Sequence, residues 1–458
     1  MNEHTPRWVR FEIPIDTLDP WTLLPPLQQD GARLMAWSAP SKGVNFVAVG
    51  AVIEFRPQGS ARFDEARTWW KPIAEQLDTR NDGGQSIDSQ TPACVAGFAF
   101  RSDEQRSSEW MAWGDGALCV PEILIWSSSN KSVAVFTIDT MQDDTDEKLA
   151  ELRDLLDDWM SRAHPQSSAV ANGQVKAPGA LEGAWEAWRS RVESAQESMA
   201  TSGLRKVVLA RSQAFTPAET HSFDPLATAW ALRKRQTDST TFLIRRKDGQ
   251  AFLGSSPETL VQLENQHVTT VALAGTRKRS AASSDEDKAL GAALLDSEKD
   301  RQEQKIVSEA IVDALGAYVR DLHQTADPEI VLHPDVQHLR TEIHGRLNQS
   351  ATIFELVKQL HPTPAVGGLP RESALAWLDH HEHLDRGWYA GPIGWINPSG
   401  DGEFVVAIRS VLMAGHIASA FAGCGLVLNS NPADEWEESQ IKLQTVRQGL
   451  AFQQSVDR

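Results

Sequence analysis

Cysteine is scarce in this chain, whose 458 residues include only Cys94, Cys119 and Cys424. Three widely separated cysteines exclude a disulfide framework and a thiolate metal cluster, and they suit a reducing compartment. Long apolar runs are missing as well. No stretch of about eighteen apolar residues is present to span a membrane, and residues 1–21 lack the apolar core and cleavage site of a signal peptide. We therefore expect a cytoplasmic protein.

Positive charge is also in deficit, because 44 Lys and Arg face 62 Asp and Glu for a formal net charge of −18. Nucleic acid and anionic membranes bind surfaces with clustered Lys and Arg, so we expect neither as a partner. An anionic small molecule is repelled at long range too. Its site must therefore gather positive charge locally, from a metal ion, a few basic side chains or backbone amides.

The hydrophobic fraction of 41% is that of a chain with a globular core. An acidic segment with helical spacing, residues 143–158, leads into a Pro, Ser, Ala and Gly-rich stretch at 164–180, which is the best candidate for a linker or long loop. The sheet-rich N-terminal part, residues 1–165, has short apolar runs such as 133–138. We expect it to form one intertwined globular unit with the second region, residues 180–453.

Strand patterns come in adjacent runs in the second region. Residues 206–211 predict a strand, residues 259–263 and 267–273 flank a short polar turn as a hairpin does, and residues 404–409 predict another strand. Because strands follow one another rather than alternating with helices, the pattern favours an α+β fold with antiparallel sheets over a doubly wound α/β fold.

Three helices are predicted among these strands. The first begins near Ser297, whose hydroxyl can cap a helix with Asp300 at its third position, and a second covers residues 353–360. The third has Asn431 as its cap and runs toward Phe452. The first helix is predicted to extend to residue 322, because apolar residues continue at three-to-four spacing through Val307, Ile311, Leu315, Tyr318 and Leu322.

Two of these helices carry acids at helical spacing. Glu303 extends the apolar stripe of the first helix, with Asp300 on the same face, and Glu435 and Glu438 are three residues apart on the last helix. Carboxylates placed in this way can hold a hard cation such as Mg²⁺. The alternatives stay open: an acidic first turn that complements the helix dipole, and a solvated face on which Glu438 pairs with Lys442 for about 0.2 to 0.5 kcal/mol.

Other polar residues allow two interpretations each. Lys206 has apolar neighbours, so it lies either at a sheet edge or partly buried with the lowered pKa of a general base. Glu258 directly follows a turn that can aim its carboxylate into a cleft. The glycines in residues 422–427 leave room for backbone amides to approach an anion, or form a tight strand turn. The cluster HisHisGluHis at 380–383 lacks the spacing of zinc ligands, so we expect it at the surface.

Taken in order, these segments resemble the chorismate-binding enzymes, a family that includes isochorismate, salicylate, anthranilate and aminodeoxychorismate synthases. The resemblance covers about residues 180–449. It rests on LysValValLeuAlaArg (206–211), GlySerSerProGluThrLeu (254–260), LeuAlaGlyThrArg (273–277), SerGluLysAspArgGlnGlu (297–303), HisProThrProAlaValGlyGlyLeuPro (361–370), GlyProIleGlyTrp (391–395), ValAlaIleArg (406–409), AlaGlyCysGly (422–425) and GluTrpGluGluSerGlnIleLys (435–442).

The resemblance implies a fold of large antiparallel sheets with helices on the outside, and a magnesium site. Glu303 and Glu438 match the family's direct Mg²⁺ ligands, and Asp300 and Glu435 lie close by, acting through water. The metal holds the ring carboxylate of chorismate. The resemblance places further substrate-binding residues at Gly275, Thr276, His338, Ala365, Val366, Arg409, Gly423, Cys424, Gly425 and Lys442.

The resemblance also implies a reaction. Lys206 matches the general base that activates water for attack at ring carbon 2, and Glu258 matches the general acid that protonates the departing 4-hydroxyl. Ala274 stands where aminodeoxychorismate synthases usually carry a lysine. The base at Lys206 points to water rather than ammonia, so no glutamine amidotransferase subunit is expected. The block at 361–368 is most similar to the isochorismate synthases. The alternatives are a salicylate synthase, which shares the acid and the base and then eliminates pyruvate, and an anthranilate synthase-like subunit. Menaquinone and siderophore synthesis are both open destinations for the product, and we expect a monomer.

Overall fold

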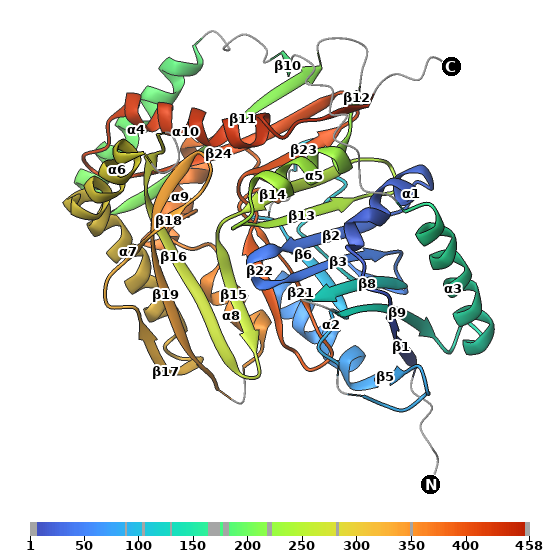
Figure 1. The fold of residues 1–458 in the computed structure, drawn as a ribbon. Coiled ribbons are helices and arrows are strands. Elements are labelled where there is room, and N and C mark those ends of the chain that lie inside the picture. Colours follow the sequence, from blue (N-terminus) through green and yellow to red (C-terminus); the bar gives the residue numbers. More distant parts are fainter. Residues whose placement is uncertain are drawn as a thin grey trace.

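The structure, a computed structural model, describes residues 7–87, 89–102, 106–128, 131–163, 175–176, 183–217, 222–280, 284–348 and 351–453. Within these ranges the chain forms two large sheets and a small one, flanked by helices (Figure 1). No helix in the described ranges is long and apolar enough to cross a membrane.

The larger sheet has thirteen strands in the described part of the chain and its main path runs β10-β11-β24-β23-β14-β13-β2-β3-β8-β9-β1-β5, with β20 paired to β11. Its strands pair antiparallel, as β11 does with β24, apart from β1 and β5, which are parallel. The strand bounds are β1 Trp8–Ile15, β2 Leu34–Ala39, β3 Val44–Val49, β5 Leu77–Asn81, β8 Ile123–Ser128, β9 Lys131–Asp139, β10 Val175–Lys176, β11 Lys206–Pro217, β13 Thr240–Arg245, β14 Ala251–Ser256, β20 Gly368–Leu369, β23 Ser410–Ala414 and β24 Ile417–Leu426.

The second sheet has ten strands in the described ranges, along the path β17-β19-β16-β15-β22-β21-β6-β7-β4, with β18 paired to β19. A small sheet joins β12 to β25 near the C-terminus. The bounds are β4 Ile53–Phe55, β6 Cys94–Phe98, β7 Gly116–Val120, β15 Thr259–Glu264, β16 His267–Lys278, β17 Val319–Gln324, β18 Glu329–Leu332, β19 Val336–Leu347, β21 Pro392–Ile396, β22 Gly402–Val406, β12 Ser222–Phe223 and β25 Phe452–Gln453.

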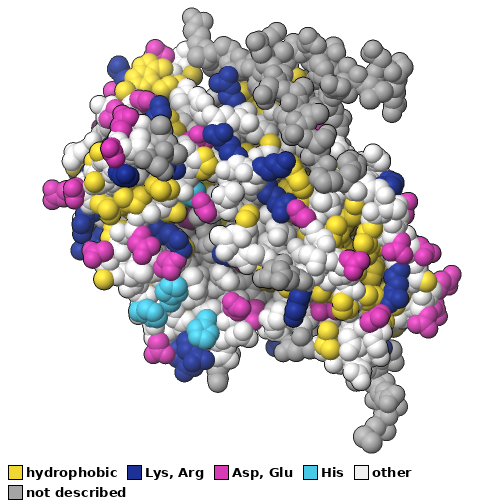
Figure 2. Space-filling view, viewed as in Figure 1, with side chains coloured by type: hydrophobic (Ala, Val, Ile, Leu, Met, Phe, Trp, Pro, Cys, Tyr) yellow, Lys and Arg dark blue, Asp and Glu magenta, His cyan; other side chains and the backbone are white. Residues whose placement is uncertain are grey.

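Helices flank both sheets. In Figure 1, α6 and α7 lie beside β16 and β19 at the left, α10 lies beside β24 at the top, and α3 lies at the far right. Figure 2 shows Asp and Glu side chains gathered over α3, as expected of the acidic segment predicted there. The bounds are α1 Leu24–Gln29, α2 Arg62–Gln76, α3 Thr145–Ser161, α4 Ala184–Thr201, α5 Pro225–Arg235, α6 Asp285–Asp296, α7 Glu298–Leu315, α8 Ile353–Leu360, α9 Arg371–His381 and α10 Pro432–Arg447, with short 3₁₀ turns η1 Pro20–Leu23 and η2 Pro40–Lys42.

The chain passes from one large sheet to the other at two neighbouring places. Between β14 and β15 it crosses at Pro257 and Glu258, and between β22 and β23 it crosses back at residues 407–409. The two crossings are joined by main-chain hydrogen bonds, from Ser255 N to Arg409 O (3.2 Å) and from Val406 N to Glu258 O (3.0 Å). We call this pair of crossings the seam. It fixes the positions of Glu258 and Arg409 relative to both sheets.

Strands from the N-terminal part, residues 1–165, and from the second region, residues 180–453, pair in both large sheets. In the larger sheet β2 pairs with β13, and in the second sheet β6 pairs with β21. One buried apolar cluster includes residues from both regions, such as Trp37 and Phe242. The hydrogen-bond ladders and the core therefore link the two regions directly.

Several predicted elements are confirmed. The α+β fold with antiparallel sheets is present, residues 206–211 begin β11, and β15 and β16 form the predicted hairpin. Helix α8 has the predicted bounds, 353–360. Ser297 caps α7, where its hydroxyl oxygen accepts a hydrogen bond from Asp300 N (3.3 Å). The stretch predicted as a linker, 164–180, lies outside the described residues apart from β10.

The predicted extension of the first helix to residue 322 is wrong. Helix α7 ends at Leu315, Tyr318 lies in a turn, and Leu322 belongs to β17, which pairs with β19. Both side chains still pack against the core from these positions. The apolar spacing therefore continues past the helix although the helical backbone does not.

Two other predicted boundaries were also too long. The strand predicted at 404–409 ends at Val406, because Ile408 N turns back to Val406 O (2.7 Å) and Arg409 has a φ of +53°. The last helix ends at Arg447, and Phe452 lies in β25 opposite Phe223. The strand ends at a local backbone turn, whereas Phe452 is placed by its pairing with β12, a partner distant in sequence that local spacing does not reveal.

The cluster at 380–383 is only partly at the surface. His380 and His383 are exposed, but Glu382 is buried and receives hydrogen bonds from Arg386 Nη2 (2.6 Å) and Ala210 N (2.8 Å). The prediction of a surface cluster was wrong for Glu382. A buried carboxylate of this kind requires such partners, which lie elsewhere in the fold.

Candidate active site

A cavity of about 530 Å³ lies where β11, β16, β19 and β24 meet α7, α10 and the seam. It gathers fourteen of the sixteen site residues that the sequence singled out, among them both predicted catalytic groups and all four acids. These fourteen are Lys206, Glu258, Gly275, Thr276, Asp300, Glu303, His338, Ala365, Arg409, Gly423, Gly425, Glu435, Glu438 and Lys442.

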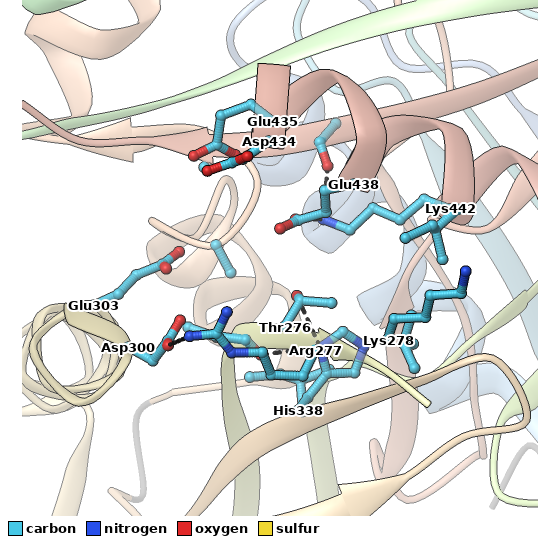
Figure 3. Close-up of a pocket in the computed structure, with 18 of the residues that line it drawn as sticks. Thr276, Arg277, Lys278, Asp300, Glu303, His338, Asp434, Glu435, Glu438 and Lys442 are labelled. Atoms are coloured by element: carbon cyan, nitrogen blue, oxygen red, sulfur yellow. Dashed lines mark hydrogen bonds and ion pairs between the residues drawn. The ribbon is translucent and has the colours of Figure 1, made fainter. Parts of the chain in front are cut away.

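Two helices present the acids to this cavity. Figure 3 shows Asp300 and Glu303 projecting from α7, and Glu435 and Glu438 projecting from α10 on the other side of the same space. In each helix the two acids are three residues apart and so lie on one face. Asn431 holds the start of α10 in place, since its side-chain oxygen accepts a hydrogen bond from Ala433 N (2.8 Å).

Each of the four acids is paired with a different cation. Lys206 Nζ lies 2.8 Å from Glu303 Oε1, and Lys442 Nζ lies 2.6 Å from Glu438 Oε1. The other two pairs are formed by Arg277 Nη2 with Asp300 Oδ2 (3.0 Å) and by Lys299 Nζ with Glu435 Oε1 (3.7 Å). These four pairs balance one another in charge, and Arg409 adds a further cation to the cavity of this acidic protein.

Lys206 is buried within the larger sheet rather than at an edge. Its strand, β11, pairs with β20 at Lys206 itself and with β24 from Val207 onward, and the side chain is 1% exposed. The lysine side chain passes over Gly425 on β24, where an added Cβ would lie 3.0 Å from Lys206 Cε and 2.8 Å from Glu303 Oε1. The absence of a side chain at Gly425 thus leaves room for the ion pair.

Glu258 is positioned by the seam and is 3% exposed. Ser256 Oγ accepts a hydrogen bond from Glu258 N (3.2 Å), and Thr363 Oγ1 donates one to Glu258 Oε1 (3.4 Å). Burial raises the pKa of the Glu258 carboxyl to about 7, against the smaller opposing effects of Thr363 and nearby cations. A carboxyl with this pKa holds a proton near neutral pH and can donate it.

His338 and Arg409 line the cavity side by side. Burial, together with the charge of Arg409, lowers the pKa of His338 well below its ordinary value, so the ring is neutral. Its Nδ1 lies 3.1 Å from the Gly275 carbonyl oxygen and its Nε2 lies 3.4 Å from Arg409 Nη2. These partners assign the proton to Nδ1 and leave Nε2 to accept from Arg409. Gly275 supplies the positive φ of +70° at a bulge in β16.

The acids of the cavity differ in their titration. Burial by itself raises the pKa of Glu303, but the ammonium of Lys206 outweighs burial and holds this pKa below its ordinary value. Burial raises the pKa of Glu435, and the neighbouring Glu438 carboxylate adds to the rise. Burial alone would lower the pKa of Lys442, but Glu438 reverses this and raises it. The pairing with Lys206 therefore keeps Glu303 ionised in the cavity.

Val366 and Cys424 do not line the cavity. Val366 is buried in the core, and its carbonyl oxygen accepts a hydrogen bond from Arg386 Nη1 (2.8 Å). Cys424 lies beneath α10, where its thiol donates to the Glu435 carbonyl oxygen (3.1 Å). Ligand atoms of Cys424, Glu435 and Glu438 lie within 4.8 Å of one another, so the thiol lies near the two acids although it does not line the cavity.

Sequence reasoning missed several residues that line the cavity or contact its groups. Arg277 and Lys278 follow Thr276 on β16, Lys299 precedes Asp300 on α7, and Thr363 contacts Glu258. Arg277, Lys299 and Thr363 lie inside quoted motifs, which was the available signal. What the sequence could not show is which acid each cation approaches.

The fold and the cavity are those of an enzyme that acts on a small anionic molecule, and comparison with known proteins gives the family. Residues 1–451 match the family described as chorismate binding enzyme, and the chain belongs to it. The chain is 34% identical to the salicylate biosynthesis isochorismate synthase of Pseudomonas aeruginosa, over 97% of this chain and 90% of that protein. It is 31% identical to the isochorismate synthase MenF of Bacillus subtilis, over 96% and 93% of the two chains.

A solved structure supports the same assignment. The menaquinone-specific isochorismate synthase MenF from Escherichia coli superposes with a TM-score of 0.79 at 25% identity, covering 97% of this chain and 95% of that one. The anthranilate synthase component I from Streptococcus pneumoniae shares the fold with a TM-score of 0.70 at 20% identity, over 88% of this chain and 92% of that one. The expected fold of large antiparallel sheets with flanking helices is thereby confirmed.

Proposed function

We propose that this chain is an isochorismate synthase, which converts chorismate to isochorismate. The relatives from Pseudomonas aeruginosa and Bacillus subtilis carry that activity in their names, and one observation in the structure supports it most directly. A buried amine, Lys206, and a buried carboxyl that retains a proton near neutral pH, Glu258, line the same cavity. Addition of water at one carbon and loss of hydroxide at another require one group of each kind.

In the proposed reaction Lys206 acts in its neutral amine form, after losing the proton of the ammonium that pairs with Glu303, and accepts a proton from the water that attacks ring carbon 2. Glu258 donates a proton to the 4-hydroxyl, which leaves as water, so the ring gains and loses the same atoms. Each group is expected to contribute about 10²- to 10⁴-fold. Arg409, Lys442 and the backbone amides at Gly423 and Gly425 are proposed to receive substrate carboxylates.

The four acids suit Mg²⁺, because carboxylate oxygens are the ligands that this hard cation prefers. In the proposal Glu303 and Glu438 hold the ion directly, while Asp300 and Glu435 act through water. When bound, the ion supplies positive charge that holds the ring carboxylate of chorismate. The ligand atoms of Glu435 and Glu438 lie within 4.8 Å of one another, as shared coordination or a shared water shell requires.

A product assay tests the function. When the purified chain is incubated with chorismate and Mg²⁺, we expect isochorismate and no pyruvate. Chromatography identifies the products. Lys206→Ala and Glu258→Ala are each expected to abolish turnover while chorismate binding stays detectable. Lys305 is an exposed lysine outside the cavity, so the control variant Lys305→Ala is expected to keep the wild-type turnover. Failure of the wild-type chain to form isochorismate would reject the proposal, and full activity in either catalytic variant would reject that residue's role.

A second candidate is a salicylate synthase, which shares the acid and the base. The name of the Pseudomonas relative connects it to salicylate biosynthesis. Release of salicylate and pyruvate in the same assay would favour this candidate. Whether the product enters menaquinone or siderophore synthesis depends on the enzymes that consume it.

We also propose that the chain works in the cytoplasm as a monomer and without a glutamine amidotransferase subunit. The buried Lys206 supports water as the nucleophile, and the net charge of −18 disfavours self-association. Adding ammonium salts or glutamine is therefore expected to yield no aminated product. An aminated product in this assay would reject water as the nucleophile.

A further inference from the structure

The pairs between acids and cations in the cavity are of two kinds. Lys206 and Lys442 are 1% and 12% exposed and belong to the proposed catalytic and binding groups. Arg277 and Lys299 are 45% and 52% exposed, and their partners Asp300 and Glu435 are 9% and 6% exposed. We call Arg277 and Lys299 the rim cations. Their acids lie inside the cavity, but the cations themselves lie at its solvent border.

The rim cations act on the acids that the proposal links to the metal through water. Arg277 projects from β16 to Asp300 on α7, and the dashed line in Figure 3 marks this contact. Lys299 projects from α7 to Glu435 on α10, so its ion pair joins the two helices that carry the acids. Each rim cation therefore lies against one of the two acid-bearing helices at the point where a divalent ion is proposed to bind.

A divalent ion that uses these carboxylates has to share them with the rim cations. An N–H group that donates to a carboxylate oxygen occupies a lone pair that a metal-bound water needs as its acceptor. The positive charge of the guanidinium or ammonium also repels the incoming ion. Both effects lower the affinity for the ion, and neither requires the rim cation to touch the substrate.

We propose that Arg277 and Lys299 are positioning residues that compete with the divalent ion for Asp300 and Glu435. They thereby set the concentration of Mg²⁺ at which the site fills. This inference rests on the proposed function, because it takes the four acids as the metal site.

The size of the effect follows from the exposure of the rim cations. Ion pairs that are open to solvent contribute little, so removing one rim charge is expected to tighten ion binding by about two- to fivefold. Because Arg277 and Lys299 contact different acids, their effects should multiply, and the double variant is expected to bind about four- to twenty-fivefold more tightly.

The test is a titration of the full-length chain with Mn²⁺, in which free Mn²⁺ is measured by electron paramagnetic resonance and Mg²⁺ is then added as competitor. The variants are Arg277→Gln, Lys299→Gln and the double variant. Lys305→Gln is the matched control. Lys305 lies on the same helix as Lys299 and pairs with Glu309, and its substitution by Gln changes the net charge by the same amount. Arg277→Lys and Lys299→Arg keep the charge and are expected to keep the wild-type affinity.

Tighter ion binding in the two Gln variants, with no change in Lys305→Gln, is the expected result. Unchanged or weaker binding in both Gln variants would overturn the inference, and so would equal tightening in Lys305→Gln, because that would reflect net charge alone. Turnover of chorismate by the same wild-type sample separates this inference from the proposed function. Isochorismate formation with unaltered ion affinity in the variants overturns the inference alone. A wild-type chain that binds no Mn²⁺ overturns the inference and the proposed metal site, and a wild-type chain that forms no isochorismate overturns the proposed function.

Discussion

Gly425 shows how one missing side chain shapes the cavity. Its backbone does not require glycine, since it has no positive φ, and it pairs regularly with Val208 across β11 and β24. What requires glycine is the space above it, which Lys206 and Glu303 fill. The position is therefore constrained by the site and not by the stability of the strand.

Gly425→Ala is accordingly expected to impair catalysis far more than folding. The new methyl group displaces the flexible ends of Glu303 and Lys206, and a misplacement of about 1 Å in a catalytic group costs up to roughly 100-fold in rate. The free energy of unfolding should change by less than about 1 kcal/mol. Steady-state kinetics and urea denaturation measure the two effects. Gly316→Ala, at a helix end where an added Cβ meets only ordinary contacts, is the control and should change neither.

Glu258 makes the stability of the protein depend on pH. Its pKa is about 7 in the folded chain against an ordinary value of 4.5, so the folded state keeps a proton that the unfolded state loses. Stability therefore falls as pH rises from about 4.5 to about 7, and the full cost, roughly 3 kcal/mol at most, is present above that range. Retaining this buried acid costs stability, as is common for catalytic groups.

Glu258→Gln is expected to remove that cost along with activity. Its melting temperature should exceed that of the wild-type chain at about pH 8, and the difference should vanish below about pH 4.5, where both states of the wild type are protonated. Differential scanning fluorimetry of both proteins between about pH 4 and pH 8 measures the difference in melting temperature. A variant that is less stable than the wild type at the upper pH would contradict the raised pKa.

At the residue scale the sequence predicted which side chains matter better than what they contact. The motifs are short local patterns, so the sequence alone could identify the residues that they contain. Fourteen of the residues identified in this way line one cavity. The pair of Arg277 with Asp300 and the pair of Lys299 with Glu435 depend on how β16, α7 and α10 pack. Nothing local in the sequence encodes that packing.

Among the elements, α10 depends most on its first turn, because that turn carries Glu435. Asn431 caps it, and Trp188 Nε1 on α4 donates to the Pro432 carbonyl oxygen (3.1 Å). Trp436, one residue beyond Glu435, packs against Trp185 and Trp188 at ring separations of 6.0 and 5.8 Å. The acid is thus held by the cap and by aromatic packing on α4.

Asn431→Ala is expected to destabilise the protein by about 1 kcal/mol, the usual cost of losing a cap. It should also weaken Mn²⁺ binding, since the first turn that positions Glu435 loosens. Urea denaturation and the Mn²⁺ titration measure the two effects. Asn431→Ser retains a capping oxygen and should restore both, so a failure of this variant to do so would show that Asn431 acts through something other than the cap.

Element boundaries were the least predictable part of the fold. The start of α7 followed from Ser297 and Asp300, which are neighbours in sequence, and was correct. Its end was missed because Tyr318 and Leu322 face the core from a turn and a strand with the spacing of a helix. Caps are local and can be read from sequence, whereas strand pairing is not.

At the scale of the whole molecule, the shared sheets predict that the chain unfolds as one unit. Separating residues 1–165 from residues 180–453 would break ladders such as β2 with β13 and β6 with β21, leaving backbone groups without partners. We expect one calorimetric transition for the intact chain and no folded product from either fragment alone. Two separate transitions, or a fragment with a cooperative transition of its own, would contradict this.

The seam has a consequence for how enzymes with this architecture can diverge. Glu258 and Arg409 are held at their mutual spacing by main-chain bonds between the two crossings, and Gly254 lies beside them, where an added Cβ would come within 2.9 Å of the Arg409 carbonyl oxygen. Because Gly254 pairs with Ser410, a bulkier residue at Gly254 would push β23 away from β14 within the larger sheet and shift Arg409 relative to Glu258. The geometry offered to a reacting ring is therefore adjustable from a position that no substrate reaches, while every group that performs the chemistry stays the same.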